Sequence, residues 1–166
     1  VDNVVLMNAL TTLCAASDRV TRVNAAVTGV VASNDSASAL TASGERHSAL
    51  RVVIAAGAWA GQISGAPLAR VVQPARGQLV SYKSIGLRHV TYGPRGYLVP
   101  RASGTVVAGS TMEEVGFDSN TTPEGLAKVK SAAEEIAPAL AISPVTDEWA
   151  GLRPITPDML PIIGRD

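Results

Sequence analysis

The 166-residue chain has little of what marks several large classes of protein. Its single cysteine, Cys14, allows no internal disulfide, and no Cys and His residues recur with the spacing of a metal site. Cys14 lies in an apolar helical pattern, so we expect it to be a small core residue. The 14 Lys and Arg residues balance 14 Asp and Glu residues, and no basic cluster occurs. This argues against nucleic acid and anionic membrane surfaces as partners.

Long apolar runs are absent too. The longest, Val52 to Ala60, is too short to cross a bilayer, and no secretory signal pattern is found, so we expect a cytoplasmic chain without a membrane span. Apolar residues still make up 46% of the sequence, which is enough for a core and argues against disorder. The chain opens without Met and stops directly after a motif, so we expect a fragment of a longer protein.

The first third of the chain predicts a helix and a small antiparallel meander. Asp2 or Asn3 can cap a helix, because apolar residues then recur at helical spacing until about Ser17. Short β-branched runs and turn clusters follow in alternation. Strands are predicted at 20–23, 27–32, 39–42 and 49–56, with turns at 33–36 and 43–45.

The run from Arg51 to Gly61 predicts a buried strand that enters a tight turn and a short helix. Val52, Val53 and Ile54 are followed by small residues and glycine. Such a turn lets the backbone come close to a flat or anionic ligand. The pattern is common in proteins, so alone it carries little functional information.

From Pro67 onward the pattern predicts an antiparallel sheet and one further helix. Arg76, between a proline and a glycine, is interpreted as an arginine in a turn. Thr122 is the expected cap of a helix whose first residue is Pro123. The apolar stripe of this helix is Leu126, Val129, Ala133 and Ile136. Strands are predicted at 71–80, 89–92, 97–101, 105–108 and 142–152, with hairpin turns at 94–96 and 102–104.

The last nineteen residues, Glu148 to Asp166, carry the strongest functional signal. Pro154 disfavours a helical conformation for Arg153, and in an extended chain Trp149, Gly151 and Arg153 point to the same side. A guanidinium can hold a carboxylate through two parallel hydrogen bonds, and Gly151 leaves room for a flat group. These residues alone are equally compatible with a surface arginine beside a turn.

The order of motifs adds a resemblance to a known family. WAGLRP at 149–154, followed by TPD at 156–158 and LPIIG at 160–164, resembles the C-terminal signature of the FAD-dependent amino-acid oxidases. That family includes glycine oxidase, sarcosine oxidase and D-amino-acid oxidase. VVIAAGAWA at 52–60, GYLVP at 96–100 and GSTME at 109–113 also resemble family segments. The resemblance implies an α+β fold, with a mixed, mostly antiparallel sheet flanked by helices and part of the FAD-binding domain's strands.

The resemblance also implies roles for particular residues. Arg153 would hold the substrate carboxylate beneath the flavin ring, and the hydroxyl of Tyr97 would donate to the same carboxylate. Met112, Trp149 and Gly151 would line the substrate pocket. Without the resemblance, Tyr97 reads as a half-buried sheet tyrosine and Met112 as a core side chain.

For the cofactor, the resemblance implies that FAD contacts the backbone at Val27 and the turn that contains Ala56, Gly57 and Trp59. The GxGxxG sequence that opens the family's FAD-binding domain does not occur in this chain. We therefore expect a fragment that lacks the N-terminal pyrophosphate-binding segment and the C-terminal closing segment, and that alone binds FAD weakly or not at all. The implied domains are 1–66 (partial FAD-binding domain), 67–148 (substrate-binding domain) and 149–166 (return segment).

The implied activity is FAD-dependent oxidative deamination of a small amino acid, most like that of glycine oxidase. The products would be an imino or keto acid, ammonia and hydrogen peroxide. Two alternatives stay open: a non-catalytic binding domain of the same fold, and an amino-acid dehydrogenase that passes electrons to a quinone. We also expect self-association, because a truncated cofactor domain leaves apolar strand edges uncovered.

Overall fold

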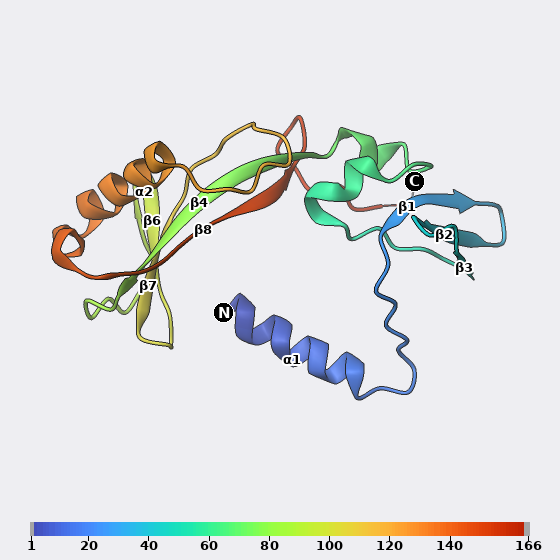
Figure 1. Cartoon of the computed structure of the whole chain (residues 1–166), viewed down its shortest axis with the longest axis horizontal. Helices are drawn as coiled ribbons and strands as arrows, with labels where there is room; N and C mark the ends of the chain where they lie inside the picture. Colours follow the sequence, from blue (N-terminus) through green and yellow to red (C-terminus); the bar gives the residue numbers. More distant parts are fainter. Residues whose placement is uncertain (1, 165–166) are drawn as a thin grey trace.

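The structure is a computed structural model that describes residues 2–164, and it contains two antiparallel sheets. Figure 1 shows the smaller sheet at one end of the molecule and the larger sheet, with helix α2 beside it, at the other. A long strand pair, β4 and β8, runs between the two ends. The elements of the smaller sheet and its surroundings are α1 (Asn3–Ala15), β1 (Val27–Ala32), β2 (Ala37–Thr41), β3 (Arg46–Ala49), η1 (Gly57–Gln62) and η2 (Leu68–Val71). Those of the larger sheet are β4 (Gln73–Lys83), β5 (Thr91–Gly93), β6 (Gly96–Pro100), β7 (Thr105–Gly109), α2 (Pro123–Ile136), η3 (Pro138–Ile142) and β8 (Val145–Ile155).

The larger sheet has the strand order β5-β6-β7-β4-β8, and every neighbouring pair is antiparallel. Both predicted hairpins are confirmed, with Gly93 opposite Gly96 across a two-residue turn. The last strand starts three residues later than predicted, at Val145, because the preceding residues form the 3₁₀ helix η3. The predicted α+β fold with a mostly antiparallel sheet and flanking helices is confirmed.

One face of the larger sheet is packed under α2. The helix begins as predicted: the Thr122 hydroxyl accepts from the Gly125 amide at 3.1 Å, and Pro123 occupies the first position. Its predicted apolar stripe packs against the sheet, with Val129 and Ala133 buried. Complete burial of one aliphatic side chain stabilises a fold by roughly 1.5–3 kcal/mol. Because several such side chains are buried between α2 and the sheet, this layer is the main core. The core consists of Val80, Tyr82, Leu98, Val106, Ala108, Val129, Ala133 and Leu140.

The opposite face of the same sheet carries a different set of residues. Tyr97 lies opposite Gly109, Gly109 opposite Leu79, and Leu79 opposite Trp149, so these residues form one row across four strands. Two residues further along β8, Gly151 lies opposite Gly77. Directly paired residues point to the same side of a sheet. Trp149, Gly151 and Arg153 therefore share this face with Tyr97, as predicted for the three β8 residues.

The smaller sheet confirms the predicted meander but shifts its last strand. The turn between β2 and β3 contains Gly44, whose φ of +87° suits a residue without a Cβ. The third strand is Arg46–Ala49 rather than 49–56, and 20–23 and 50–56 have no regular structure, so the strands predicted there are wrong. A β-branched run forms a strand only when a neighbouring strand completes its hydrogen bonds. Among residues 2–164 no strand pairs with either segment.

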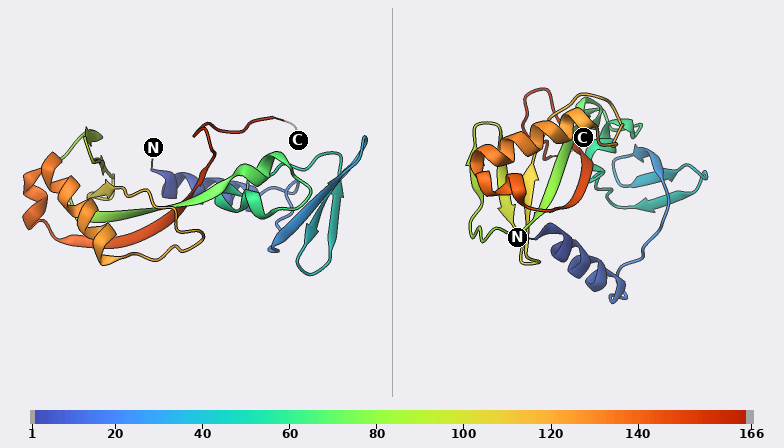
Figure 2. Two further views of the ribbon diagram at one scale, coloured as in Figure 1. Left: turned by 90° about the horizontal axis from the view of Figure 1, so that it is seen from above. Right: turned by 60° about the vertical axis from the view of Figure 1, so that its left-hand side comes forward.

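Helix α1 lies away from both sheets in Figure 1 and in the right-hand view of Figure 2, and the Asp2 carboxylate at its start is 3.8 Å from the Arg101 guanidinium. It begins where predicted, since the Asp2 carboxylate accepts from the Val4 amide at 3.0 Å, and it ends at Ala15. None of its residues is buried, and Cys14 is exposed. The prediction that Cys14 is a core residue is therefore wrong, because helical periodicity does not itself supply a surface to pack against. Within residues 2–164, none of the helices combines the length and hydropathy needed to cross a lipid bilayer.

Candidate functional site

Arg153 lies on the face opposite α2, and its guanidinium rests against the backbone of β4. A Cβ at Gly77 would come within 2.8 Å of the Arg153 Cζ atom, so a larger residue there would displace the guanidinium from this position. Nη1 donates a hydrogen bond to the Thr111 carbonyl oxygen at 3.1 Å, and Nη2 donates to the Ser110 hydroxyl. The side chain therefore has one defined orientation, set by β4 below it and the Ser110–Thr111 segment beside it.

The charge of Arg153 is not balanced by a neighbouring carboxylate. Both of its hydrogen-bond acceptors are neutral, and no acidic side chain among residues 2–164 forms an ion pair with it. A guanidinium has five N–H donors, so three remain after the two that are engaged. The arrangement is that of a fixed, half-buried cation with donors available for an anion.

Tyr97 reaches the same short segment from β6. A Cβ at Gly109 would lie 2.6 Å from the Tyr97 hydroxyl oxygen, so the phenol lies across this glycine. Gly109 directly precedes Ser110 and Thr111, the two residues that bind the Arg153 guanidinium. The structure thus brings two predicted site residues from β6 and β8 to three consecutive residues at the end of β7.

The other predicted pocket residues, Met112, Trp149 and Gly151, are more open to solvent. Met112 follows Thr111 and is 53% exposed, so it is not a core side chain. Trp149 is half-buried, and a Cβ at Gly151 would have no atom within 4 Å, so space is open beside β8. Met112 borders a hollow of about 380 Å³, which Arg153 and Tyr97 do not line. The hollow is lined by Arg95, Ser110, Thr111, Met112, Glu113, Lys128 and Val129.

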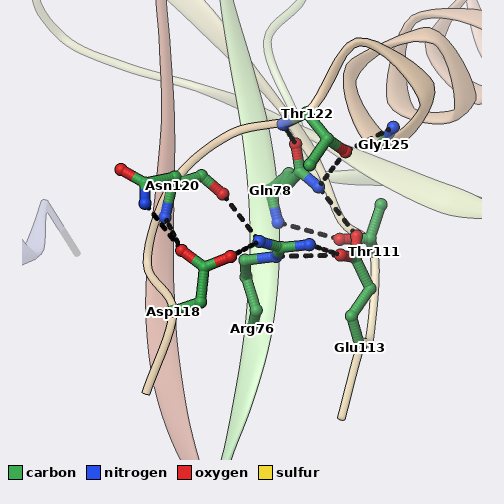
Figure 3. A network of polar contacts seen from close by, with 8 residues as sticks. All are labelled: Arg76, Gln78, Thr111, Glu113, Asp118, Asn120, Thr122 and Gly125. Atoms are coloured by element: carbon green, nitrogen blue, oxygen red, sulfur yellow. Dashed lines mark hydrogen bonds and ion pairs between the residues drawn. The ribbon is translucent and has the colours of Figure 1, made fainter. Parts of the chain in front are cut away.

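Arg76 is not a turn residue, so that prediction is wrong. It lies inside β4, because β8 pairs with β4 through Pro74 and Gly77 without interruption. Only 5% of its surface is exposed. Its guanidinium donates to Glu113 through Nε at 2.8 Å and to Asp118 through Nη1 at 2.7 Å. Gln78 donates to the other oxygen of Glu113 at 2.8 Å. Figure 3 shows this polar network, which consists of Arg76, Gln78, Thr111, Glu113, Asp118, Asn120, Thr122 and Gly125.

The charges of the polar network are mutually stabilised. Burial of Glu113 opposes its charged form, but hydrogen bonds from Thr111, Arg76 and Gln78 outweigh burial, and the pKa of Glu113 is lowered. The hydrogen bond with Glu113 is the largest cause of the raised pKa of Arg76. Hydrogen bonds from the backbone amide and the side chain of Asn120, followed by the charge of Arg76, lower the pKa of Asp118. All three groups therefore stay ionised at neutral pH.

Of the predicted cofactor residues, Ala56, Gly57 and Trp59 lie at helix η1, whereas Val27 lies on β1 of the smaller sheet. Gly57 has a φ of +55°, a Cβ there would meet no atom within 4 Å, and Ala56 immediately precedes it. Trp59 is 50% exposed, and its helix η1 packs against β4 and β8. Gly57 and Gly151 thus both leave open space where a Cβ would lie. Val27 is 42% exposed in β1, and β1 is hydrogen-bonded to Ser64, just after η1.

Sequence reasoning missed the residues that orient Arg153. Ser110 and Thr111 supply the acceptors, while Gly77 and Gly109 make room for Arg153 and Tyr97. One signal was present, since a glycine inside a strand pattern often marks a close approach by another group. Nothing in the residue types of Ser110 and Thr111 marks them as ligands of an arginine.

The sequence and the fold of the chain are both similar to those of known proteins. The model of the DAO family, described as FAD dependent oxidoreductase, matches residues 1–166. The chain is 37% identical over 117 residues to a glycine oxidase of Pseudomonas aeruginosa, covering 69% of this chain and 32% of that protein. Iminodiacetate oxidase from Chelativorans sp. BNC1 superposes with a TM-score of 0.75 at 30% identity, over 88% of this chain and 41% of the other. L-proline dehydrogenase from P. horikoshii superposes with a TM-score of 0.71 at 26% identity, over 84% and 40%. The chain thus spans about a third of the length of the curated relative.

Proposed function

Because the chain belongs to the DAO family of FAD-dependent oxidoreductases, we propose that the whole protein oxidises the Cα–N bond of a small amino acid. Glycine is the favoured substrate, on the basis of 37% identity to a glycine oxidase. With glycine, one water and one O₂ are consumed, and glyoxylate, ammonia and hydrogen peroxide are released. The observation that carries the proposal is Arg153, a fixed cation whose neutral acceptors leave its charge unbalanced.

In this proposal Arg153 binds the substrate carboxylate. Its remaining N–H donors can form two parallel hydrogen bonds with a carboxylate, which fixes both position and rotation of the acid group. The hydroxyl of Tyr97, held across Gly109, supplies another donor to the same group. Holding the carboxylate at two points places Cα in one orientation, and such positioning lowers the entropic part of a reaction barrier.

FAD, when bound, supplies the redox chemistry by accepting the electron pair of the substrate Cα–H bond. On the protein side, we assign Trp149 and Gly151 of β8 and the Ala56–Gly57–Trp59 turn to the ring, and the Val27 backbone to the adenine. Met112, exposed next to Thr111, is assigned to the substrate pocket. Residues 1–66 would then belong to the cofactor domain, 67–148 to the substrate domain, and 149–166 to a segment that returns toward the flavin.

A second candidate differs only in the electron acceptor. The similarity to L-proline dehydrogenase, at 26% identity, favours considering an amino-acid dehydrogenase that reduces a quinone. The same Arg153 and Tyr97 would bind the substrate carboxylate in either case. Release of hydrogen peroxide separates the two candidates, because a dehydrogenase of this kind passes its electrons to the quinone instead of O₂.

The experiment for the proposed function uses the full-length, FAD-loaded protein. Peroxide release is measured with glycine, sarcosine and D-alanine as substrates, with and without an added quinone analogue. We expect glycine-dependent peroxide release without quinone. Turnover only with quinone would support the dehydrogenase, and no turnover with any of the three substrates under either condition would contradict the proposed function.

We further propose that the 166 residues alone bind FAD weakly or not at all and self-associate. They contain no GxGxxG sequence for the pyrophosphate, and α1 exposes apolar side chains, with Leu13 at 67% and Val5 at 65%. Size-exclusion chromatography with detection of visible flavin absorbance measures both properties. A yellow monomer would contradict this pair of expectations.

A further inference from the structure

We propose that Arg76, Gln78 and Glu113 are positioning residues for Arg153, because they hold the Ser110–Thr111 segment that orients its guanidinium. The inference rests on the proposed function, since it concerns how the same site binds a carboxylate. None of the three residues would touch the substrate. They would act through the two oxygen atoms that Arg153 contacts.

The Ser110–Thr111 segment lies outside the regular strand ladder. The last β7 pair joins Gly109 to Leu79, and the next pairing joins Glu113 to Arg76. Between these pairings, two residues of β4 face three residues, 110–112, on the other side, which is the count of a β-bulge. The extra residue turns the segment out of the ladder, so its oxygen atoms need other contacts to hold their places.

The polar network supplies these contacts. The backbone amide of Gln78 donates to the Thr111 hydroxyl at 3.0 Å. The backbones of Arg76 and Glu113 exchange two hydrogen bonds, at 2.8 and 3.0 Å. Their side chains form an ion pair, and Gln78 binds the remaining oxygen of Glu113 (Figure 3). Thr111 is thus bound directly and is also fixed by its second neighbour along the chain.

Three consecutive residues of β4 have complementary tasks. Arg76 and Gln78 point toward the α2 face, where they are 5% and 0% exposed. Gly77, between them, faces the other side, and the Arg153 guanidinium lies across it. The strand therefore supports the guanidinium from below on one face, while on the other face it anchors the segment that accepts its hydrogen bonds.

The polar network also binds the residues just before α2. Gln78 accepts from the Thr122 amide at 2.8 Å and donates to its hydroxyl at 3.1 Å. Arg76 binds the Asp118 carboxylate and the Asn120 carbonyl oxygen. Both ends of the segment 110–122 are thus attached to the same two residues of β4. Loss of the Glu113 charge removes the ion pair with Arg76 and leaves only the two backbone hydrogen bonds between these residues.

The test uses the full-length protein and the affinity for acetate, a carboxylate probe that requires no turnover, measured by calorimetry. Glu113→Gln keeps the size of the side chain but removes its charge. We expect the acetate Kd to rise about tenfold, as for the loss of one hydrogen bond to a charged group. The glycine KM should rise in parallel, because a displaced Arg153 binds the carboxylate less tightly. We expect kcat to change by less than about threefold.

A second variant and a matched control accompany this measurement. Thr111→Val removes the acceptor for the Gln78 amide and leaves the ion pair intact, so it should also raise the acetate Kd. Glu45→Gln removes an exposed carboxylate in the turn before β3 of the smaller sheet, outside the polar network and the hollow beside Met112, and should leave the Kd unchanged. The melting temperature of each variant reports any general loss of stability.

A double-mutant cycle separates positioning from a general structural effect. If Glu113 acts through Arg153, Glu113→Gln should change the acetate Kd by less than about twofold when Arg153→Lys is already present. Equal effects in both backgrounds, or an unchanged Kd in both folded single variants, would overturn the positioning role. If Arg153→Lys alone leaves the acetate Kd at its wild-type value, the proposed function is overturned as well. The two failures are therefore distinguishable.

Discussion

The guanidinium of Arg153 lies across Gly77, the residue opposite Gly151 on the neighbouring strand. A methyl group on Gly77 would come within 2.8 Å of Cζ, which is closer than two carbon atoms can approach without displacement. The neighbours of Gly77 in the sequence, Arg76 and Gln78, face the other side of the sheet and are buried. A single strand therefore places the cation and the network behind it.

Gly77→Ala should displace the Arg153 guanidinium. In the full-length protein we expect the glycine KM to rise about tenfold or more, because the added Cβ and the guanidinium cannot occupy the same space. Steady-state kinetics with a count of bound FAD measures the effect. Ser103→Ala, a change at an exposed residue in the turn between β6 and β7, is the control. A normal KM in Gly77→Ala would show that the guanidinium does not need this position.

Tyr97→Phe should weaken substrate binding without unfolding the sheet. The change removes only the hydroxyl, and a hydrogen bond to a charged carboxylate contributes about 1.5–3 kcal/mol, or roughly tenfold or more in KM. Tyr92→Phe is a matched control, because Tyr92 contacts the Tyr97 ring at a centroid distance of 6.1 Å but is 78% exposed. Equal KM values for the two variants would remove the Tyr97 hydroxyl from the site.

The polar network should make stability depend on pH in the acidic range. The folded-state pKa values of Glu113 and Asp118 lie below their ordinary values of 4.5 and 3.8. Below about pH 4.5 the unfolded chain therefore binds protons that the folded chain does not, and the free energy of unfolding falls as the pH falls. Urea titrations between pH 7 and pH 3 measure this slope. Glu113→Gln should reduce it, and an unchanged slope would contradict the assignment.

Tyr82→Phe should leave the protein equally stable or stabilise it by about 1 kcal/mol. The Tyr82 hydroxyl is buried in the core and has no hydrogen-bond partner among the described residues. Burial, with the charges of Glu134 and Glu148, raises the pKa of this phenol to about 12. Denaturant unfolding measures the stability and ultraviolet titration the pKa. A loss of more than 1 kcal/mol would reveal a hydrogen bond that the structure does not contain.

Local rules predicted the elements whose signals are local. The α2 cap at Thr122, the two hairpins and the shared face of Trp149, Gly151 and Arg153 follow from residue types and a fixed period. The rules failed where a distant segment decides. The run at 50–56 has strand propensity but no neighbour among residues 2–164, and Cys14 lies on a helix without a covering surface.

The sequence predicted the charged and aromatic residues of the candidate site. It did not predict the residues that orient them. Arg153 and Tyr97 belong to motifs that can be compared with a family, so their positions were expected. Arg76 was misread because a flanking proline and glycine usually mark a turn, whereas β8 here pairs with β4 across both. The contact of Arg153 with Thr111 depends on a bulge that only tertiary pairing creates.

The central claim is that Arg153 binds the substrate carboxylate, and it is tested most directly by peroxide release from glycine in the full-length, FAD-loaded protein with Arg153→Ala. The exposed Arg88→Ala is the control. Removing one partner of a partly buried charge pair costs about 3 kcal/mol, so we predict a fall in kcat/KM of roughly a hundredfold or more, with FAD content unchanged. Turnover equal to that of the wild type and of the Arg88 variant would contradict the account.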